Sequence, residues 1–435
     1  MRSGMRVMLR QIRGQPSRHA DLVVVGAGMC GVSFARHAAE AGKRVVLLDS
    51  GSIGSGMTGS SAGHVMTGFL PSPAEMISKV GAVETLRLQR WSHESKLALR
   101  RRWADLGLGH AITDGYLLVA RNREEREVIQ GIAAYWREEL NIEDVRVTSG
   151  QELVDYIRSP TVDSALYDPT SFCIDPPALV EGLRLLVRHR EIDVHEETRV
   201  VHVASDSGRQ RIETTRGTMT AERIVVCTGA SVIDFVDGAA SPMITKRTRF
   251  VVTDPIPREI LRLVLPAGLS GSDCSHDPDY WTVLRDGRLM VGCGGGADPP
   301  AQPDRGTACD ALQVKIRGAA SGPCQGQALG TQSAKRVHGP ASGGPFEGHS
   351  DDDSPAQPDR ADATEPGQTK EHLKRLFPSL ADHLRGHHLV AEVDTTPSGL
   401  PEMREVRPGL VVAHGFSGLG LAAGYGVAGL LALRA

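Results

Sequence analysis

The chain has 435 residues, 40 % of them hydrophobic and 4 % aromatic, and its formal net charge is −3. This length predicts two or three domains, and the apolar fraction is enough to build sizeable cores. Because the charge is near neutral and no basic stripe alternates with aromatic residues, we expect no nucleic acid and no anionic membrane surface as a partner.

The seven cysteines form no Cys-x-x-Cys pair, and their number is odd. This pattern argues against a zinc site and against a disulfide framework, so we expect no metal site. A reducing compartment is the default expectation for such a chain, which predicts a cytoplasmic protein.

The first 20 residues contain five arginines and no acidic residue. Apolar residues recur there at helical spacing, as in a mitochondrial presequence, which makes the mitochondrial matrix the alternative location. A disordered leader, or a start codon placed too early, explains the same residues equally well.

The stretch from Asp21 to Asp49 predicts a strand, a glycine turn, a helix and a second strand. Gly26 permits the tight turn, Gly28 lets a pyrophosphate approach the backbone, and Gly31 allows the helix to pack on the strand. The phosphates then face helix N–H groups, which favour anions. Asp49 can accept both ribose hydroxyls and disfavours a 2′-phosphate, so the pattern predicts a dinucleotide other than NADP.

A loop of small residues follows over 50–65, with the sequence SGSIGSGMTGSSAGHV. An NAD-binding fold usually continues into its next helix at this point, whereas a long Gly/Ser loop suits the extended FAD molecule. A flexible linker is the alternative explanation.

The middle of the chain predicts helices over about 72–140 with a strand at 114–120, and a further helix that opens with prolines from Pro176. A strand meander leads to Thr228-Gly229-Ala230. A second β-rich block covers about 246–293 and contains a hairpin signal at Asp286-Gly287.

The hexamer PAQPDR occurs twice, at 300–305 and 355–360, on either side of a stretch rich in Gly, Ser and Ala. Such a composition cannot bury enough apolar surface to offset the entropy lost on ordering. We therefore expect a disordered insertion over 298–368, with an ordinary long surface loop as the alternative. Whether 306–360 belongs to the mature protein is left open.

Residues 408–433 carry no charge and include seven glycines. A buried strand, a Gly-rich turn and a buried helix fit this composition better than a membrane-spanning helix, so we expect no transmembrane segment. The N-terminus of that helix could face the electron-rich edge of a reduced flavin, whose anion its N–H groups would stabilise.

Together these segments resemble the D-amino-acid-oxidase-like family of FAD-dependent oxidoreductases, over about 21–433 apart from the insertion. The motifs that carry the resemblance are IGSGMTGSSAGHV (53–65), DPTSFCIDPPALVEGL (168–183), EETRVVHV (196–203), IVVCTGA (224–230), TTPSGLPEM (395–403) and PGLVVAHGFSGLG (408–420). Within the family, the pattern is most similar to the γ-glutamylputrescine oxidase and glycine/sarcosine oxidase branch.

The resemblance implies an α/β fold with α+β character. A Rossmann-like FAD-binding domain is expected from about 21–75, 160–240 and 395–435, and an interleaved mixed β-sheet substrate domain from about 76–159 and 241–394.

The resemblance also implies the cofactor contacts of this chain. The residues that it assigns to FAD are Gly26, Gly28, Gly31, Asp49, Ser50, Thr58, Gly59, Ser61, Ala62, Gly63, Val200, Thr228, Gly229, Gly415, Phe416, Ser417, Gly418 and Gly420. Serines stand at 60 and 61, where some relatives attach the flavin through a histidine, so non-covalent FAD is expected. Leu419 replaces the histidine of the motif Gly-Phe-Ser-Gly-His-Gly.

Three residues are catalytic candidates on the substrate side: His64, Tyr280 and Arg285. His64 follows the flavin loop and is expected either beside the flavin or in a structural hydrogen bond. Tyr280 and Arg285 belong to the β-rich block that is expected to cover the flavin. Arg285 could clamp a substrate carboxylate with two hydrogen bonds, or it could be a charge on a surface hairpin.

The implied reaction is oxidation of a C–N bond in a small amine or amino acid, by hydride transfer to flavin with oxygen as the acceptor. One alternative is a dehydrogenase that passes electrons to a quinone or an electron-transfer protein. The other is an FAD-binding assembly protein without turnover. The substrate, the acceptor and the oligomeric state are left open.

Overall fold

The computed structural model describes residues 19–189, 191–206, 208–236, 244–275, 277–293, 374–383 and 385–432. All of them belong to one compact unit of the chain. The expected insertion at 298–368 lies outside the described residues, and so does the expected leader except for its last two residues, which begin the first strand.

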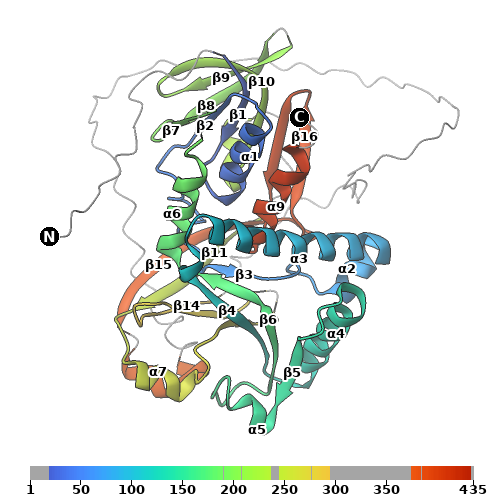
Figure 1. Ribbon diagram of the computed structural model, residues 1–435, viewed down its shortest axis with the longest axis vertical. Coiled ribbons are helices and arrows are strands. Elements are labelled where there is room, and N and C mark those ends of the chain that lie inside the picture. The colour runs from blue at the N-terminus through green and yellow to red at the C-terminus, as the bar shows by residue number, and fades with distance from the viewer. Residues whose placement is uncertain are drawn as a thin grey trace, which may run out of the picture. The chain divides into compact units, whose positions relative to one another are not determined.

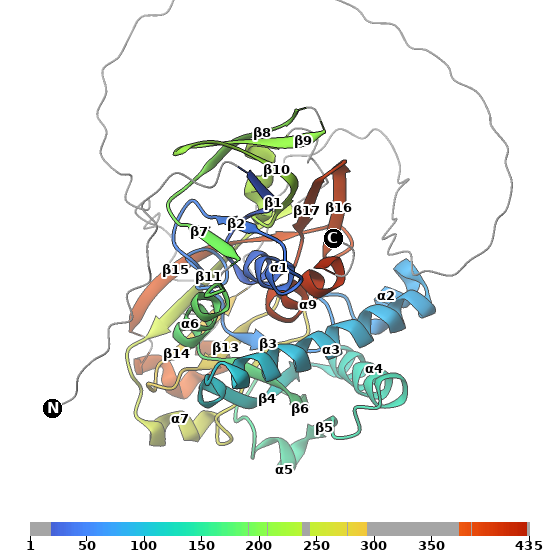
Figure 2. The ribbon, with the colours of Figure 1, turned by 45° about the horizontal axis from the view of Figure 1, so that its top comes forward.

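The first sheet lies in the upper part of Figure 1 and has eight strands. Strands β16, β17, β10, β1, β2 and β7 lie side by side in that order, as Figure 2 also shows. Its strands are β1 (His19–Val25), β2 (Val45–Leu48), β7 (Ile192–His195), β8 (Val200–Asp206), β9 (Arg209–Thr214), β10 (Gly217–Val226), β16 (Glu402–Arg407) and β17 (Leu410–His414). The central strands β17, β10, β1, β2 and β7 run parallel. Val23, Val24 and Leu47 are fully buried, as expected for parallel strands that are covered on both faces.

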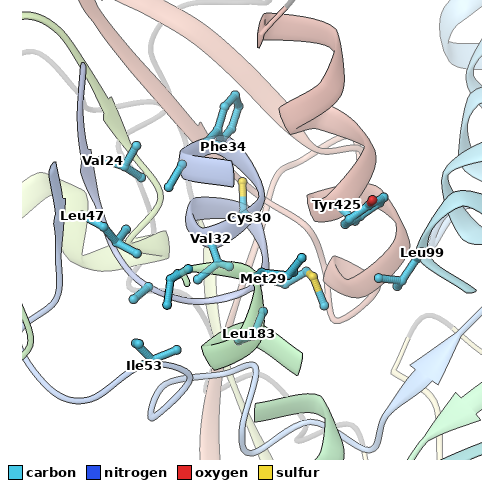
Figure 3. Packing of buried hydrophobic residues seen from close by; sticks show 14 of the residues in the cluster. Val24, Met29, Cys30, Val32, Phe34, Leu47, Ile53, Leu99, Leu183 and Tyr425 are labelled. Carbon is cyan, nitrogen blue, oxygen red and sulfur yellow. The ribbon is translucent and has the colours of Figure 1, made fainter. Parts of the chain in front are cut away.

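Three helices cover one face of this sheet and form its core with it. They are α1 (Met29–Glu40), α6 (Pro176–Leu186) and α9 (Gly420–Ala432). In Figure 3, Val24 and Leu47 of the strands face Val32 and Phe34 of α1, and Tyr425 of α9 lies on the other side of α1. Helices α1 and α9 lie side by side, as Figure 2 also shows.

The second sheet has nine strands, with β15, β11, β14, β13, β12, β4, β6 and β3 in that order and β5 paired with β6. Its strands are β3 (His64–Val65), β4 (Ile112–Ala120), β5 (Arg146–Ser149), β6 (Ser164–Ile174), β11 (Ile244–Thr253), β12 (Ser270–Asp273), β13 (Tyr280–Val283), β14 (Leu289–Cys293) and β15 (Gly386–Thr395). One of its faces forms a core around Trp281 and Phe377, whose rings meet edge to face.

Helix α3 (Ala82–Asp105) links the two sheets. A Cβ on Gly426 of α9 would fall 1.9 Å from Ser95 Oγ of α3, so only a glycine allows this close contact. On its other side, α3 reaches β6 through Lys96. The remaining elements are α2 (Pro73–Val80), α4 (Arg123–Leu140), α5 (Gly150–Leu153), α7 (Arg258–Val264), η1 (Gly109–Ala111), η2 (Gly229–Asp234) and η3 (Pro378–His383).

Two short segments differ from the expected division of the chain. Strands β3 and β6 pair within the nine-stranded sheet, whereas the prediction counted 21–75 and 160–240 as parts of the FAD domain. The reason is that β6 runs antiparallel to β4 along most of its length, and β3 pairs antiparallel with the end of β6. Among the described ranges, no helix combines the length and the apolarity needed to cross a membrane.

Candidate cofactor and active site

A cavity of about 760 Å³ lies at the carboxyl ends of β1, β2, β10 and β17. Ligands of open parallel sheets bind at this edge. The lining comes from five regions that are far apart in the sequence: 25–30, 49–61, 198–201, 227–235 and, near the C-terminus, 393–421.

The N-terminus of α1 opens onto this cavity. Its N-cap, Gly28, has no side chain to cap the helix, and the first turn contains no acidic residue. A Cβ on Gly26 would fall 2.6 Å from the carbonyl oxygen of Cys227, and φ at Gly26 is +99°. The turn therefore requires glycine. The N–H of Met29 donates to Thr58 Oγ1 at 3.0 Å, and the rest of this helix N-terminus is placed for a diphosphate.

Asp49 stands where β2 ends and holds two backbone segments together. Its Oδ2 accepts the N–H of Ala27 at 2.6 Å, and its Oδ1 accepts the N–H of Gly51 at 2.8 Å. A carboxylate offers about four acceptor positions. Asp49 therefore fixes the wall of the cavity and keeps acceptor capacity for ribose hydroxyls.

Thr228 contributes a hydroxyl without a partner. Its Oγ1 is buried, has no hydrogen bond, and belongs to a residue of the cavity lining. Leaving such a group unpaired costs about 1–3 kcal/mol. A polar ligand in the cavity would remove that cost, so the residues present fit a dinucleotide such as FAD.

The C-terminal glycine segment closes the cavity and is held by the end of β15. Asp394 Oδ2 accepts the N–H of Gly415 at 2.5 Å, and the Asp394 carbonyl accepts the N–H of Ser417 at 3.0 Å. The hydroxyls of Thr395 and Ser417 lie 2.8 Å apart. These bonds bring Gly420, the first residue of α9, into the lining, so a second helix N-terminus meets the cavity.

Most of the predicted FAD contacts lie in the lining: Gly26, Gly28, Asp49, Ser50, Thr58, Ser61, Val200, Thr228, Gly229, Phe416, Gly418 and Gly420. The others lie outside it: Gly31, Gly59, Ala62, Gly63, Gly415 and Ser417. Three of these glycines allow two backbone segments to pack closely. A Cβ on Gly31 would fall 1.8 Å from the carbonyl oxygen of Gly26. A Cβ on Gly59 would fall 2.2 Å from that of Gly54, and a Cβ on Gly63 would fall 2.0 Å from that of Ile174.

Sequence reasoning missed several lining residues, among them Cys30, Arg199, Cys227 and Asp394. Cys30 and Cys227 stand inside two motifs that the sequence analysis identified, close to their glycines. Their position in these motifs could have predicted that they line the cavity. Asp394 directly precedes the motif TTPSGLPEM, but its place in the cavity could not be predicted because its strand pairs with residues that are distant in the sequence.

His64 is bonded on both sides of its ring. Its Nε2 lies 2.8 Å from Thr282 Oγ1 and 3.2 Å from the Trp281 carbonyl, and its Nδ1 lies 3.1 Å from Tyr116 Oη. Burial lowers the pKa of His64 to about 4. The ring is therefore neutral at pH 7, and the carbonyl selects the tautomer that is protonated at Nε2, which leaves Nδ1 to accept from Tyr116. His64 thus ties β3 to β13 and β4.

The structure brings Tyr280 close to His64, with 6.0 Å between the ring centroids. Burial raises the pKa of Tyr280 to about 12, and its hydroxyl lies 3.3 Å from Thr248 Oγ1. Arg285 is elsewhere: it is exposed, on the turn between β13 and β14, and its guanidinium donates to the carbonyl of His110. None of the three predicted catalytic residues lines the cavity.

A buried ion pair that sequence reasoning did not identify joins α3 to β6. Lys96 Nζ lies 3.6 Å from Asp168 Oδ2 and donates to Thr170 Oγ1 at 2.6 Å, and the Lys96 side chain is 0 % exposed. Burial lowers the pKa of Lys96 to about 8. Burial raises the pKa of Asp168, but the Lys96 charge and the Ser171 and Thr170 hydroxyls outweigh it, and the net shift is downward.

No metal centre is present in the part of the chain that the structure describes, since no three His, Cys, Asp or Glu side chains there are grouped to hold an ion.

Similar proteins point to one family. The family model described as FAD dependent oxidoreductase matches residues 21–434. A probable oxidoreductase of Haemophilus influenzae is 23 % identical over 63 % of this chain and 64 % of its own length. The gamma-glutamylputrescine oxidoreductase of Escherichia coli is 26 % identical over 64 % of this chain and 66 % of its own length. The chain thus spans just under two thirds of these two relatives.

The fold has counterparts among solved structures. A glycine oxidase from Geobacillus kaustophilus superposes with a TM-score of 0.65, covering 96 % of this chain and 94 % of that one at 19 % identity. The predicted fold class, with its Rossmann-like unit and mixed sheet, is thereby confirmed. The predicted family is confirmed by the family model. The chain belongs to the family of FAD-dependent oxidoreductases.

Proposed function

We propose that the protein oxidises a C–N bond of a small amine or amino acid by hydride transfer to FAD, with oxygen as the electron acceptor. The observation that carries this proposal is the 760 Å³ cavity, which combines an open helix N-terminus, the Asp49 carboxylate and the unpaired hydroxyl of Thr228. The names of the relatives, a gamma-glutamylputrescine oxidoreductase and glycine oxidases, support an amine or amino acid as substrate.

Each region of the lining suits one part of the cofactor. The N-terminus of α1 at Gly28 would hold the pyrophosphate, and Asp49 would accept the ribose hydroxyls. The N-terminus of α9 at Gly420 would hold the electron-rich end of the flavin through its N–H groups. FAD, when bound, supplies the acceptor of the hydride. We propose that it is held without a covalent bond, since serines occupy positions 60 and 61.

On the substrate side the chain offers neutral groups. His64 is uncharged at pH 7, and Tyr280 keeps its proton there because burial raises its pKa. The Tyr280 hydroxyl can help to orient an amine that arrives uncharged, and the rings of His64 and Tyr280 can exclude water, without removing a proton themselves. The exposed position of Arg285 favours the surface-hairpin alternative over a carboxylate clamp.

Turnover with a panel of primary amines, secondary amines and amino acids tests the proposal. We expect at least one substrate to consume oxygen and yield hydrogen peroxide in equal amount, together with an aldehyde or keto acid. Turnover with an artificial acceptor but without peroxide would favour the dehydrogenase alternative. Absence of turnover with every substrate and acceptor would favour the assembly protein.

For the compartment we propose the cytoplasm, with the mitochondrial matrix as the alternative. All five cysteines in the described ranges are free thiols, as a reducing compartment requires. Fractionation of cells that make the full chain distinguishes the two, because a presequence would be removed and shorten the protein.

A further inference from the structure

Cys30 and Cys227 meet in the wall of the cofactor cavity. Both thiols are free, both residues line the cavity, and Cys227 is near enough to Cys30 to raise the pKa of the Cys30 thiol. Two other described cysteines have different partners, because the thiols of Cys274 and Cys293 donate to backbone carbonyls.

The backbone fixes this meeting. Cys227 directly follows β10, and its N–H donates to the carbonyl of Val25 at 2.8 Å, beside the glycine turn. Its own carbonyl lies 2.6 Å from where a Cβ on Gly26 would be. Cys30 stands in the first turn of α1, where the same turn ends. The two thiols therefore lie on either side of the turn that is proposed to hold the pyrophosphate.

The two sulfurs differ in environment. The neighbouring Cys227, burial, and the nearby charge of Asp394 hold the pKa of Cys30 well above its usual range. Cys30 is 9 % exposed, whereas Cys227 is half-buried. Because a protonated, buried thiol reacts slowly, Cys227 is the sulfur that an oxidant in the cavity meets first.

We propose that Cys30 and Cys227 are a site of reversible disulfide formation, which a hydroperoxide closes when the cavity lacks FAD and which bound FAD shields. The Cys227 sulfur attacks the peroxide oxygen, the O–O bond breaks, and water leaves, so that Cys227 becomes a sulfenic acid. The Cys30 sulfur then attacks the sulfenic sulfur, and a second water leaves. In total, two thiols lose two electrons and two protons to one hydrogen peroxide, which gives two waters.

Closing the bond has a consequence for the cofactor. A disulfide holds its two Cβ atoms at about 3.8 Å, so it would bind the loop at Thr228 to the first turn of α1 across the floor of the cavity. We expect the affinity for FAD to fall on the order of tenfold, about 1.4 kcal/mol.

The test uses the full chain with Cys309 and Cys324 replaced by serine, so that any disulfide detected joins two of the five described cysteines. Flavin-depleted and FAD-saturated samples receive hydrogen peroxide, and peptides are mapped by mass spectrometry without reduction. We expect a Cys30–Cys227 cross-link in the flavin-depleted sample, reversed by dithiothreitol. With FAD at about 100 times its Kd, about 1 % of cavities are empty, so the cross-link should form about 100-fold more slowly.

Variants separate this site from general oxidation. Cys227→Ser should abolish the cross-link, and Cys30→Ser should leave a Cys227 sulfenic acid that dimedone traps. The matched control Cys274→Ser, a half-buried cysteine outside the cavity lining, should retain the cross-link. Absence of the cross-link in flavin-depleted protein with native circular dichroism would overturn the proposal.

The shielding part rests on the proposed function, because it requires FAD in this cavity. If the protein holds FAD and the cross-link forms equally fast, shielding is wrong. If the cross-link forms but the protein takes up no FAD, the proposed function fails and the disulfide site stands.

Discussion

Replacing Lys96 by methionine should destabilise the protein strongly, because it leaves the Asp168 carboxylate buried without its cation. Removing one member of a buried ion pair typically costs about 3–5 kcal/mol. Asp168 would still accept hydrogen bonds from the Thr170 N–H at 2.8 Å, from the Thr170 hydroxyl at 2.6 Å and from Ser171. Since these bonds compensate part of the charge, we expect the lower end of that range, about 3 kcal/mol.

The assay is urea denaturation of flavin-depleted protein, which removes stabilisation by bound cofactor. The double variant Lys96→Met/Asp168→Asn removes both charges and keeps an acceptor for Thr170, so it should recover at least about half of the loss. The control is Arg123→Met, which breaks an ion pair whose side chains are 88 % and 62 % exposed. It should cost less than about 0.5 kcal/mol. If Lys96→Met costs no more than this control, the reasoning about the buried pair is refuted.

Three further predictions concern the cavity and its surroundings. Gly28→Val should lower the affinity for FAD by more than about tenfold. The control Gly131→Ala in α4 should leave the affinity unchanged, because a Cβ there meets nothing within 4 Å. Titration of the two variants with FAD measures the difference. His64 has a pKa of about 4 in the folded protein and 6.5 when exposed, so the unfolded state binds more protons between these values and stability is lost as pH falls through this window. His64→Asn should reduce that slope by up to about 1.4 kcal/mol per pH unit in urea denaturation, and an unchanged slope would contradict the assignment. Arg285→Ala should leave the KM unchanged for any amino-acid substrate. A tenfold rise in KM would instead support the hypothesis that Arg285 clamps the substrate carboxylate.

Residues that act through local backbone geometry were predictable from the sequence. The glycine turn at Gly26–Gly31 and Asp49 at the end of β2 depend on spacing within one βαβ unit, and the structure places the turn and the acid together in one lining. The strand, turn and helix near the C-terminus were likewise expected from composition and appear as β17 and α9.

Features that depend on distant pairings were not predictable. Lys96 and Asp168 meet only because α3 packs on β6, and neither stands in a motif that shows this. Cys30 and Cys227 become neighbours through the parallel pairing of β1 with β10. Arg285 shows the reverse case: a hairpin signal was correctly placed at 286–287, but whether its charge points toward a substrate depends on tertiary packing around His110.

The central claim is that this cavity holds FAD and that an amine reduces it there. Mixing the purified FAD-bound protein with a panel of amines and amino acids in the absence of oxygen tests this claim most directly. We predict that at least one compound bleaches the visible absorption band of the flavin, and that readmitting oxygen restores the band. A flavin band that stays unchanged with every compound, in protein shown to contain FAD, would contradict the account.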